Sequence, residues 1–479
     1  MRRTKIVATL GPVTDDDKVL TAMLQAGVDV ARLNFSHGTR DEQEKRVGQL
    51  RRIAKKVGRA VAMIGDLGGP KIRIKRFRDG KVTLLDGERF VLDARLESRA
   101  GTAEAVAVSH PDLAADLNLG DVLLLGDGHV MLTVEDFDGH RVGCKVTAGG
   151  VVSDHQGLNR QGGGLSAGAL TDKDRDDIVF AADKGLDYLA VSFVRDAADV
   201  EQARQLLRGV GSGAHLIAKI ELAEAVANID SIVEVSDAIM VARGDLGVEM
   251  GYAELTGLQK RLIRLTRGRN RVVVTATQMM ESMIHNPLPT RAEVSDVANA
   301  VMDGSDALML SAETAVGEHP VKAVQAMADI IVGAEKHQLP ASASRHRMNS
   351  YFERTDEAIA MAVMYTANHL NVKAIIALTE SGATTTWMSR IRSDIPIFAI
   401  TRHESTRRRV TLYRGVHPVA FDIMRIKPLE VFRKVSEELI GFGAIDEGDL
   451  VIYTRGDLSG VSGSTNTMKI MRVGGPDAT

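Results

Sequence analysis

The feature that most constrains the fold is a repeated pairing of a short apolar run with a segment suited to a helix. Each run is rich in β-branched residues, and turn or capping residues separate it from its neighbours, as is typical of βα units. Three such units precede residue 71 and five follow residue 151. The expected strands are Lys5–Leu10, Asp29–Phe35, Ala60–Leu67, Asp187–Phe193, His215–Ile220, Ala238–Ala242, Val272–Thr277 and Ala307–Leu310.

Eight βα units predict a closed barrel. The segments that contain them, 1–70 and 152–338, together hold about 257 residues, close to the ~250 residues of a TIM (β/α)8 barrel. A doubly wound α/β sheet is the alternative. Helix signals agree with the alternation, because Thr14 and Thr39 are placed to cap the first two helices and Thr171 begins a capping box.

Two further regions break the barrel pattern. Residues 71–151 contain short alternating runs between Asp-Gly turns and no long helical period, so we expect an all-β domain inserted as a lid. Residues 339–479 return to alternating helix and strand signals and predict a smaller C-terminal α/β domain. The segment Gln338–Asn349, with Pro340 and serines, is typical of a linker.

Composition excludes several classes of protein. The 479-residue chain has a net charge of −3, so it lacks the basic surface of a nucleic-acid-binding protein and a polybasic membrane patch. The apolar run after Lys5 is too short for a secretion signal or a membrane span. The single cysteine, Cys144, allows no internal disulfide, and its alternating context predicts a core residue. We therefore expect a cytoplasmic protein without nucleic-acid or membrane partners.

Polar residues follow nearly every expected barrel strand. In a TIM barrel the active site lies at the carboxyl ends of the strands, so these side chains are expected to converge at one mouth. The segments that carry them are Arg32–His37, Asp66–Arg73, Ser192, Lys219–Glu221, Arg243–Asp245, Thr275–Gln278 and Ser311–Thr314.

The residue types in these segments indicate metal and phosphate chemistry. Carboxylates without clustered His or Cys suit Mg²⁺ or Mn²⁺, whereas arginine and lysine suit phosphate and carboxylate groups. Together they favour phosphoryl transfer or enolate chemistry, in which catalysis is positioning plus charge neutralisation. Taken singly, Lys219 and Arg32 are typical of structural ion pairs and Asp245 of a helix cap, and only their shared position favours a functional interpretation.

Several long motifs are spread nearly from end to end of the chain. They are KIVATLGP at 5–12, RLNFSHG at 32–38, IAKIE at 217–221, MVARGDLGVE at 240–249, TATQMM at 275–280 and LSAET at 310–314. These motifs resemble those of the pyruvate kinase family. The resemblance implies a barrel, a lid and an effector domain in a homotetramer under allosteric control. It also implies an enzyme that transfers the phosphoryl group of phosphoenolpyruvate to ADP, giving pyruvate and ATP, in the final step of glycolysis.

The resemblance assigns roles to the strand-end residues. Glu221 and Asp245 would hold the divalent metal, and Lys219 would neutralise the phosphoryl group during transfer. Arg32 and Arg73 would bind phosphate. The other expected contacts are Ser192 and the backbone of Arg243, Gly244 and Asp245 for substrate; Thr277 with Ser311 and Glu313 for proton delivery; Pro12, Asn34, His37 and Arg73 for ADP; and Asp127 of the closing lid.

Three positions depart from the family pattern. Many members carry Glu at the position of Lys71 and Thr at the position of Leu67, and depend on K⁺. The compact ammonium of Lys71 can substitute for that ion, so we expect activity without K⁺; the alternative is that Lys71 points to solvent. Gln156 and Gly68 stand where the family commonly has lysine, so a nucleotide contact of Gln156 is in doubt and Gly68 receives no role.

The C-terminal domain contains a hydroxyl-rich loop that leads into a helix, an arrangement that can cradle a phosphate. The short 455–464 segment resembles members that respond to a sugar monophosphate or AMP, and an ordinary helix-capping turn is the alternative. The residues expected to bind the effector are Thr379, Ser381, Gly382, Thr384, Arg455, Ser462 and Ser464.

Two other functions stay open at this point. An aldolase or a phosphoenolpyruvate mutase would keep the barrel and the metal, but would need neither a nucleotide nor an effector domain. A non-catalytic metabolite sensor would use only the C-terminal domain. The joint presence of Lys219, Glu221, Asp245 and Thr277 argues against the sensor.

Overall fold

The structure is a computed structural model in which contacts divide the chain into two compact units. The first comprises residues 1–65, 184–188 and 263–479, and the second comprises 66–183 and 189–262. The residues described are 1–126, 128–166, 168, 170–337, 351–391, 393–427, 430–456 and 463–475.

Eight parallel strands form the predicted closed barrel, in the order β1-β16-β15-β14-β13-β12-β3-β2. The closure confirms the TIM barrel and excludes the doubly wound sheet. Every predicted strand is present, with each end within two residues of its expected position. The strands are β1 Lys5–Thr9, β2 Val30–Asn34, β3 Ala62–Asp66, β12 Tyr188–Val191, β13 His215–Ile220, β14 Ala238–Ala242, β15 Val272–Ala276 and β16 Ala307–Leu310.

Helix ends follow the capping rules at most predicted positions. Helix α2 (Arg40–Val57) begins after Thr39, whose side chain accepts from the N–H of Glu42, and ends at Gly58 with a φ of 73°. The prediction for Thr14 is wrong, because Pro12 starts a short 3-10 turn, η1 (Pro12–Asp15), and Asp16 caps α1 (Asp17–Ala26) instead. The Thr171–Asp174 capping box is confirmed at the start of α3 (Asp172–Asp183).

One or two of the remaining barrel helices follow each of the strands β12 to β16. They are α4 Ala197–Gly209, α5 Ala223–Ala227, α6 Ile229–Val235, α7 Arg243–Met250, α8 Tyr252–Gly268, α9 Arg291–Asp303, α10 Ala312–Ala315 and α11 Pro320–Lys336. Among the residues described, no helix is long and apolar enough to span a bilayer.

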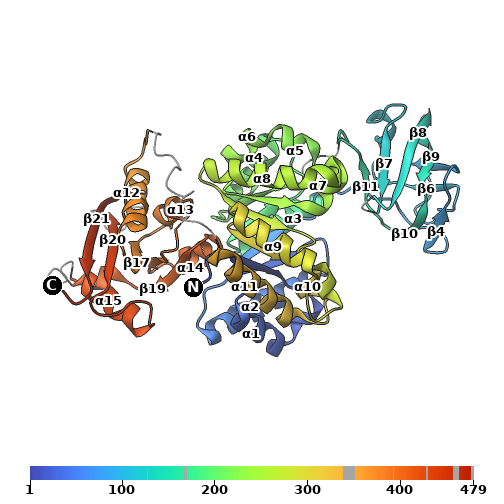
Figure 1. Cartoon of the computed structure of the whole chain (residues 1–479). Helices are drawn as coiled ribbons and strands as arrows, with labels where there is room; N and C mark the ends of the chain where they lie inside the picture. The colour runs from blue at the N-terminus through green and yellow to red at the C-terminus, as the bar shows by residue number, and fades with distance from the viewer. Residues whose placement is uncertain are drawn as a thin grey trace. The chain divides into compact units, whose positions relative to one another are not determined.

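The inserted region is built from strands, as predicted, with one short 3-10 turn, η2 (Leu113–Ala115), among its described residues. Figure 1 shows these strands side by side. Cys144 is fully buried in their apolar core, and burial raises the pKa of its thiol to about 12, which confirms the core assignment. The strands continue past residue 151, because β10 pairs with β4 and β11 pairs with β7. They are β4 Lys81–Leu84, β5 Arg89–Asp93, β6 Ala105–Ala107, β7 Val122–Leu125, β8 Val130–Asp138, β9 Arg141–Ala148, β10 Gly150–Ser153 and β11 Leu158–Arg160.

The C-terminal region forms a five-stranded sheet in the order β19-β18-β17-β20-β21, with helices as predicted (Figure 1). Both edge strands escaped the sequence analysis, because β19 contains Pro418 and β21 is largely polar. The expected linker lies mostly outside the residues described. The elements are α12 Thr355–His369, β17 Ala374–Leu378, α13 Ala383–Ser389, β18 Ile397–Thr401, α14 Glu404–Arg409, β19 Val416–Ala420, α15 Val431–Gly441, β20 Leu450–Gly456 and β21 Thr465–Arg472.

Candidate active site

Lys219, near the carboxyl end of β13, lies within a buried cluster of polar groups. Its ammonium donates to Ser192 Oγ at 2.6 Å and pairs with Asp66 Oδ1 at 3.3 Å and Glu221 Oε1 at 3.0 Å. The side chains of Asp66 and Glu221 are only 1% and 2% exposed. Lys219 is therefore held between two buried carboxylates. The alternative interpretation of Lys219 as part of a structural ion pair on the surface is wrong.

The backbone around this cluster adopts unusual conformations. Phe193 has a φ of 55°, which is rare for a residue other than glycine, and its N–H donates to Glu221 Oε2 at 2.7 Å. Gly69 has a φ of 65°, and a Cβ there would lie 2.9 Å from Ser192 Cβ and 2.8 Å from the Phe193 ring. Strained backbone of this kind persists where the surroundings fix it, and it is concentrated at functional sites.

Glu221 and Asp245, the expected metal ligands, influence one another electrostatically. Burial raises the pKa of Glu221; the Lys219 ammonium lowers this pKa, and the Asp245 carboxylate raises it. Asp245 lies in the first turn of α7, where Lys71 Nζ donates to its Oδ1 at 2.7 Å. Because the Lys71 side chain is 22% exposed and bound to Asp245, the solvent-facing alternative for Lys71 is wrong.

This donor set fits a hard divalent cation. Two neighbouring carboxylates carry negative charge that a cation would neutralise, and their oxygens are the ligands that Mg²⁺ prefers. Across the described ranges, no group of three or more His, Cys, Asp or Glu side chains is arranged to hold a metal. A Mg²⁺ ion with two protein carboxylates takes its other ligands from substrate oxygens and water, which is its usual behaviour in phosphate-handling sites.

The surroundings of the other predicted residues of the second unit can be described for all of them except Asp127. Arg243, Gly244 and Asp245 form the first turn of α7, the end of a helix that favours a bound anion. Arg73 donates from its guanidinium to the carbonyl of His155 at 2.9 Å. Gln156 lies against Gly126, where an added Cβ would meet its amide group at 3.0 Å. Asp127 lies outside the residues described.

In the first unit, the side chain of Arg32 lies beside that of Thr9, because β1 and β2 pair at these two residues. The two residues are partners in the β1–β2 pairing, and Arg32 Nη1 donates to Thr9 Oγ1 at 3.1 Å while the residue stays 8% exposed. The turn after β2 is held by Gln43, whose amide donates to the carbonyls of Asn34 and His37. Pro12 begins the 3-10 turn after β1.

Thr277 and Glu313 follow neighbouring strands of the same unit. Thr277 has a φ of 68°, which is a strong outlier for a β-branched residue, and its hydroxyl donates to the carbonyl of Ala276 at 2.6 Å. Glu313 accepts from the N–H groups of Ser311 at 2.7 Å and Met280 at 3.2 Å. Burial raises the pKa of Glu313, and these hydrogen bonds lower it. Glu313 therefore joins the segments that follow β15 and β16.

The sequence analysis missed the contribution of Asp66. It placed Asp66 at the end of the third strand but gave it no role, although the residue is fully buried and pairs with Lys219. A carboxylate directly after an apolar strand was the available signal. The structure thus brings Ser192, Lys219 and Glu221 together with Asp66, and separately joins Lys71 to Asp245.

The predicted effector loop is a compact turn before α13. Gly382 has a φ of 86°, and its N–H donates to Thr379 Oγ1 at 2.9 Å, while Ser381 Oγ accepts from the N–H of Ala383 at 3.4 Å. Thr384 is 2% exposed and shares a 2.7 Å hydrogen bond with Thr465, so its hydroxyl is already satisfied.

Two of the other expected effector residues, Arg455 and Ser464, lie among the residues described. The Arg455 guanidinium lies 5.4 Å from the centre of the Phe432 ring. Ser464 directly precedes β21, and Ser462 lies outside the residues described.

Comparison with known proteins identifies the family. The family model described as "Pyruvate kinase, barrel domain" matches residues 1–324, and the model described as "Pyruvate kinase, alpha/beta domain" matches residues 357–471. Pyruvate kinase II of Salmonella typhimurium is 52% identical over 478 residues, covering 99% of both chains, and pyruvate kinase of Haemophilus influenzae is 51% identical over 461 residues, covering 95% of this chain and 96% of its own. The crystal structure of a pyruvate kinase from Cryptosporidium parvum superposes with a TM-score of 0.92 at 34% identity, over 98% of this chain and 96% of that one.

These matches extend over both the barrel and the C-terminal domain, so they decide against an aldolase, a mutase or a sensor built on the C-terminal domain alone. Enzymes of the matched family are phosphotransferases that use Mg²⁺. The chain belongs to the pyruvate kinase family and transfers the phosphoryl group of phosphoenolpyruvate to ADP.

Proposed function

We propose that Lys219 neutralises the phosphoryl group while it moves from phosphoenolpyruvate to ADP. The observation that carries this role is the position of the ammonium, which is held by Ser192, Asp66 and Glu221 near the end of a barrel strand. A lysine fixed in this way needs little reorganisation when charge develops on a nearby oxygen, and this preorganisation lowers the barrier. Arg32 and Arg73 bind phosphate by the same electrostatic principle.

Glu221 and Asp245 would hold the divalent metal, which would supply positive charge to the oxygens that become negative during the transfer. The nearby negative charges and the oxygen-only donor set support this assignment. The N–H groups of Arg243, Gly244 and Asp245 hold the carboxylate of the substrate, since they lie in the first turn of α7. Ser192 orients Lys219 beside that substrate.

Thr277 delivers a proton to the carbon of the enolate, and Ser311 and Glu313 support it. The strained backbone of Thr277 supports a functional role, because a β-branched residue has a φ of 68° only where its surroundings impose it. Glu313 holds the segments after β15 and β16 through its bonds to Met280 and Ser311. Pro12, Asn34 and His37 contact ADP, and Asp127 of the inserted domain joins them when the lid closes and excludes water.

A coupled assay tests this proposal directly. Pyruvate formation from phosphoenolpyruvate should require both ADP and Mg²⁺ or Mn²⁺, and chelation by EDTA should abolish it. The assigned roles would be wrong if turnover persisted without a divalent ion, or if Glu221→Gln and Asp245→Asn left the metal concentration for half-maximal rate unchanged.

We also propose that Lys71 replaces the monovalent cation on which many members depend. Its ammonium donates to Asp245 Oδ1 at 2.7 Å, which supports a fixed charge in the site. A K⁺ titration against tetramethylammonium at constant ionic strength should leave the rate within about twofold, because the charge is built in. Strong activation by K⁺ would contradict this proposal, and Lys71→Gln should create a K⁺ requirement that the parent enzyme lacks.

The effector loop binds the phosphate of a sugar monophosphate or of AMP. The hydroxyls of Thr379 and Ser381 offer donors at the loop, which Gly382 holds closed through its N–H, and Arg455 and Ser464 supply the remaining donors. Because Thr384 is buried against Thr465, it shapes the loop and does not contact the ligand. Phosphosugar and AMP titrations of Ser381→Ala and Arg455→Ala variants test this site, and an unchanged response in both would contradict it.

The assembly is proposed to be a homotetramer in the cytoplasm, as the sequence analysis expects. Sedimentation velocity of the full chain across a range of concentrations tests the first statement. A monomer at every concentration would contradict it.

A further inference from the structure

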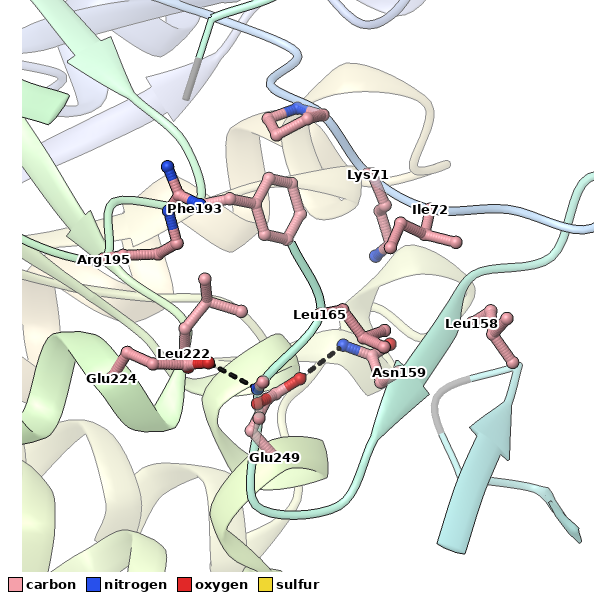
Figure 2. A pocket seen from close by; sticks show the side chains of 13 residues that line it. Lys71, Ile72, Leu158, Asn159, Leu165, Phe193, Arg195, Leu222, Glu224 and Glu249 are labelled. Carbon is pink, nitrogen blue, oxygen red and sulfur yellow. Dashed lines mark hydrogen bonds between the residues drawn. The ribbon is translucent and has the colours of Figure 1, made fainter. Parts of the chain in front are cut away.

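A hollow lies in the second unit where both linkers of the inserted domain meet loops that follow barrel strands (Figure 2). Its empty volume is about 470 Å³, including the part that is open to solvent. Residues 70–72 of the first linker and residues 158, 159 and 163–165 of the second contribute to its lining. Apolar side chains and two carboxylates complete it. We call this hollow, lined by Leu165, Phe193, Leu222, Glu224 and Glu249 among others, the hinge pocket.

The two carboxylates of the hinge pocket are incompletely paired. Glu249 is 3% exposed; its Oε1 accepts from Asn159 Nδ2 at 3.1 Å, and its Oε2 has no hydrogen-bond partner among the described residues. Glu224 Oε1 accepts from the N–H of Gly164, and its Oε2 is likewise buried without a described partner. Figure 2 shows both hydrogen bonds. A buried carboxylate oxygen left unpaired costs free energy, so these two oxygens indicate a missing donor.

The cations that line the hinge pocket are already engaged elsewhere. Lys71 donates to Asp245, and Arg195 forms a two-point ion pair with Asp199. The linker cannot supply a side chain at this point either, because a Cβ on Gly163 would lie 2.5 Å from Glu224 Oε2. One oxygen of each carboxylate therefore stays open to an external partner.

We propose that the hinge pocket binds a small primary ammonium compound with an apolar substituent. The –NH₃⁺ group donates to Oε2 of both Glu224 and Glu249, and the substituent packs on Leu165, Leu222 and Phe193. A primary ammonium carries three N–H donors, which suffices for both oxygens. A quaternary ammonium has no N–H to donate, and a neutral alcohol leaves the charges uncompensated.

Binding at this place would restrain the second linker of the inserted domain, because the two carboxylates that hold the ligand are both attached to that linker. The carbonyl of Glu249 accepts from the N–H of Gly162, and Glu224 accepts from that of Gly164. Amide hydrogen exchange in residues 158–166 should therefore slow when the pocket is occupied.

The direct test is isothermal titration calorimetry of the full chain at pH 8 with n-propylammonium chloride. We expect saturable binding with a Kd on the order of 1 to 10 mM, which is typical of a four-atom ligand with one strong ionic contact. Tetramethylammonium and 1-propanol should show no saturable heat. Glu249→Gln should weaken binding at least about tenfold, whereas Glu254→Gln, an exposed residue of α8, should leave it unchanged.

Three outcomes would overturn the proposal. The first is no saturable binding of n-propylammonium, which would mean that bridging water alone satisfies the two oxygens. The second is equal affinity for tetramethylammonium, and the third is full affinity in Glu249→Gln. None of these readouts depends on turnover, so they are independent of the catalytic roles proposed above.

The pH dependence provides a second test of the location. Burial raises the pKa of Glu249 to about 7; Asn159 lowers it, Glu224 raises it, the N–H of Ala223 lowers it, and Asp245 raises it. The charged groups that share the pocket are Glu224, Lys71 and Arg195. Since Glu249 gains its negative charge as the pH rises through 7, affinity for the ammonium should rise about tenfold between pH 6 and pH 8. A pH-independent affinity would place the ligand elsewhere.

Discussion

Two buried charge clusters, one in each compact unit, differ in how completely their charges are balanced. Arg390 and Asp306 of the first unit are 0% and 1% exposed. Arg390 Nη1 donates to Asp306 Oδ2 at 2.7 Å and to the carbonyl of Arg271 at 2.6 Å, while Asp306 also accepts from the N–H of Val273 at 2.9 Å. One cation meets one anion, and the surrounding backbone satisfies the remaining positions. Such a pair fixes the packing of the C-terminal region on the first unit's own strands.

The Lys219 cluster of the second unit is unbalanced by comparison. One ammonium meets the carboxylates of Asp66 and Glu221, and burial raises the pKa of Glu221. The backbone at Phe193 has a φ of 55° beside it. A site that binds a cation and an anionic substrate is expected to carry excess negative charge and a strained backbone while it is empty. Together with the role proposed for Lys219, the comparison suggests a rule to test: a buried cluster with excess charge serves function, and a balanced one serves stability.

Removal of Lys219 should produce the largest effect on catalysis. Lys219→Met should lower kcat at least about 10³-fold, because it removes the ammonium that neutralises the phosphoryl group during transfer. Its Tm should change less than that of an Arg390 variant, since active-site groups are commonly held at the expense of stability. Steady-state kinetics and differential scanning calorimetry of the same preparation measure both quantities.

Near-normal turnover in Lys219→Met would refute the role assigned to the ammonium. A loss of Tm larger than that of the Arg390 variant would instead break the comparison, since it would show that the Lys219 cluster stabilises the fold. Lys173→Met is a suitable control, because Lys173 pairs with Asp177 on the exposed face of α3 and its side chain is 60% exposed.

Removal of Arg390 should produce the largest effect on stability. Arg390→Met leaves the buried carboxylate of Asp306 without its partner and should lower the free energy of unfolding by about 3–5 kcal/mol. A second change, Asp306→Asn, removes the stranded charge but keeps an acceptor for the N–H of Val273. The double variant should therefore recover most of the loss in urea unfolding, and kcat at low temperature should stay near that of the parent.

If the double variant were as unstable as the single one, the loss would come from side-chain packing and not from the unpaired charge. That result would show that the charge balance of Arg390 and Asp306 does not determine the stability of this cluster. If Arg390→Met lost activity while it remained folded, the Arg390 cluster would no longer qualify as purely structural.

The barrel and its strand ends were predictable from the sequence because their signals are local. Apolar periodicity and capping residues gave all eight strands, and they placed Lys219 and Arg32 at strand ends. The exceptions have physical causes. Pro12 begins a 3-10 turn, so the first helix is capped by Asp16 and not by the predicted Thr14. Pro418 lies within β19, so the sequence of this edge strand did not have a strand pattern.

The partners within the clusters were not predictable, because they depend on which strands become neighbours. Lys71 and Asp245 are 174 positions apart, and Arg390 and Asp306 are 84 apart. The turn at Phe193 that aims its N–H at Glu221 has no sequence signature, because an aromatic residue rarely has a positive φ. The resemblance to a known family predicted roles for the catalytic residues, but it did not predict that Arg390 pairs with Asp306.

The smallest effect should come from an ion pair whose geometry matches that of Arg390 but whose surroundings are wet. In the inserted domain, Arg89 makes two hydrogen bonds to Asp136, at 2.5 and 2.9 Å, yet the two side chains are 58% and 43% exposed. Water solvates both groups whether or not they pair, so Arg89→Ala should shift the Tm by about 1 °C or less. Scanning calorimetry in low and high salt measures this shift. A loss of Tm comparable to that of Arg390→Met would show that the two-point geometry of these ion pairs, and not their burial, determines how much they stabilise the fold. The difference between the Arg390 and Lys219 clusters would then need another explanation.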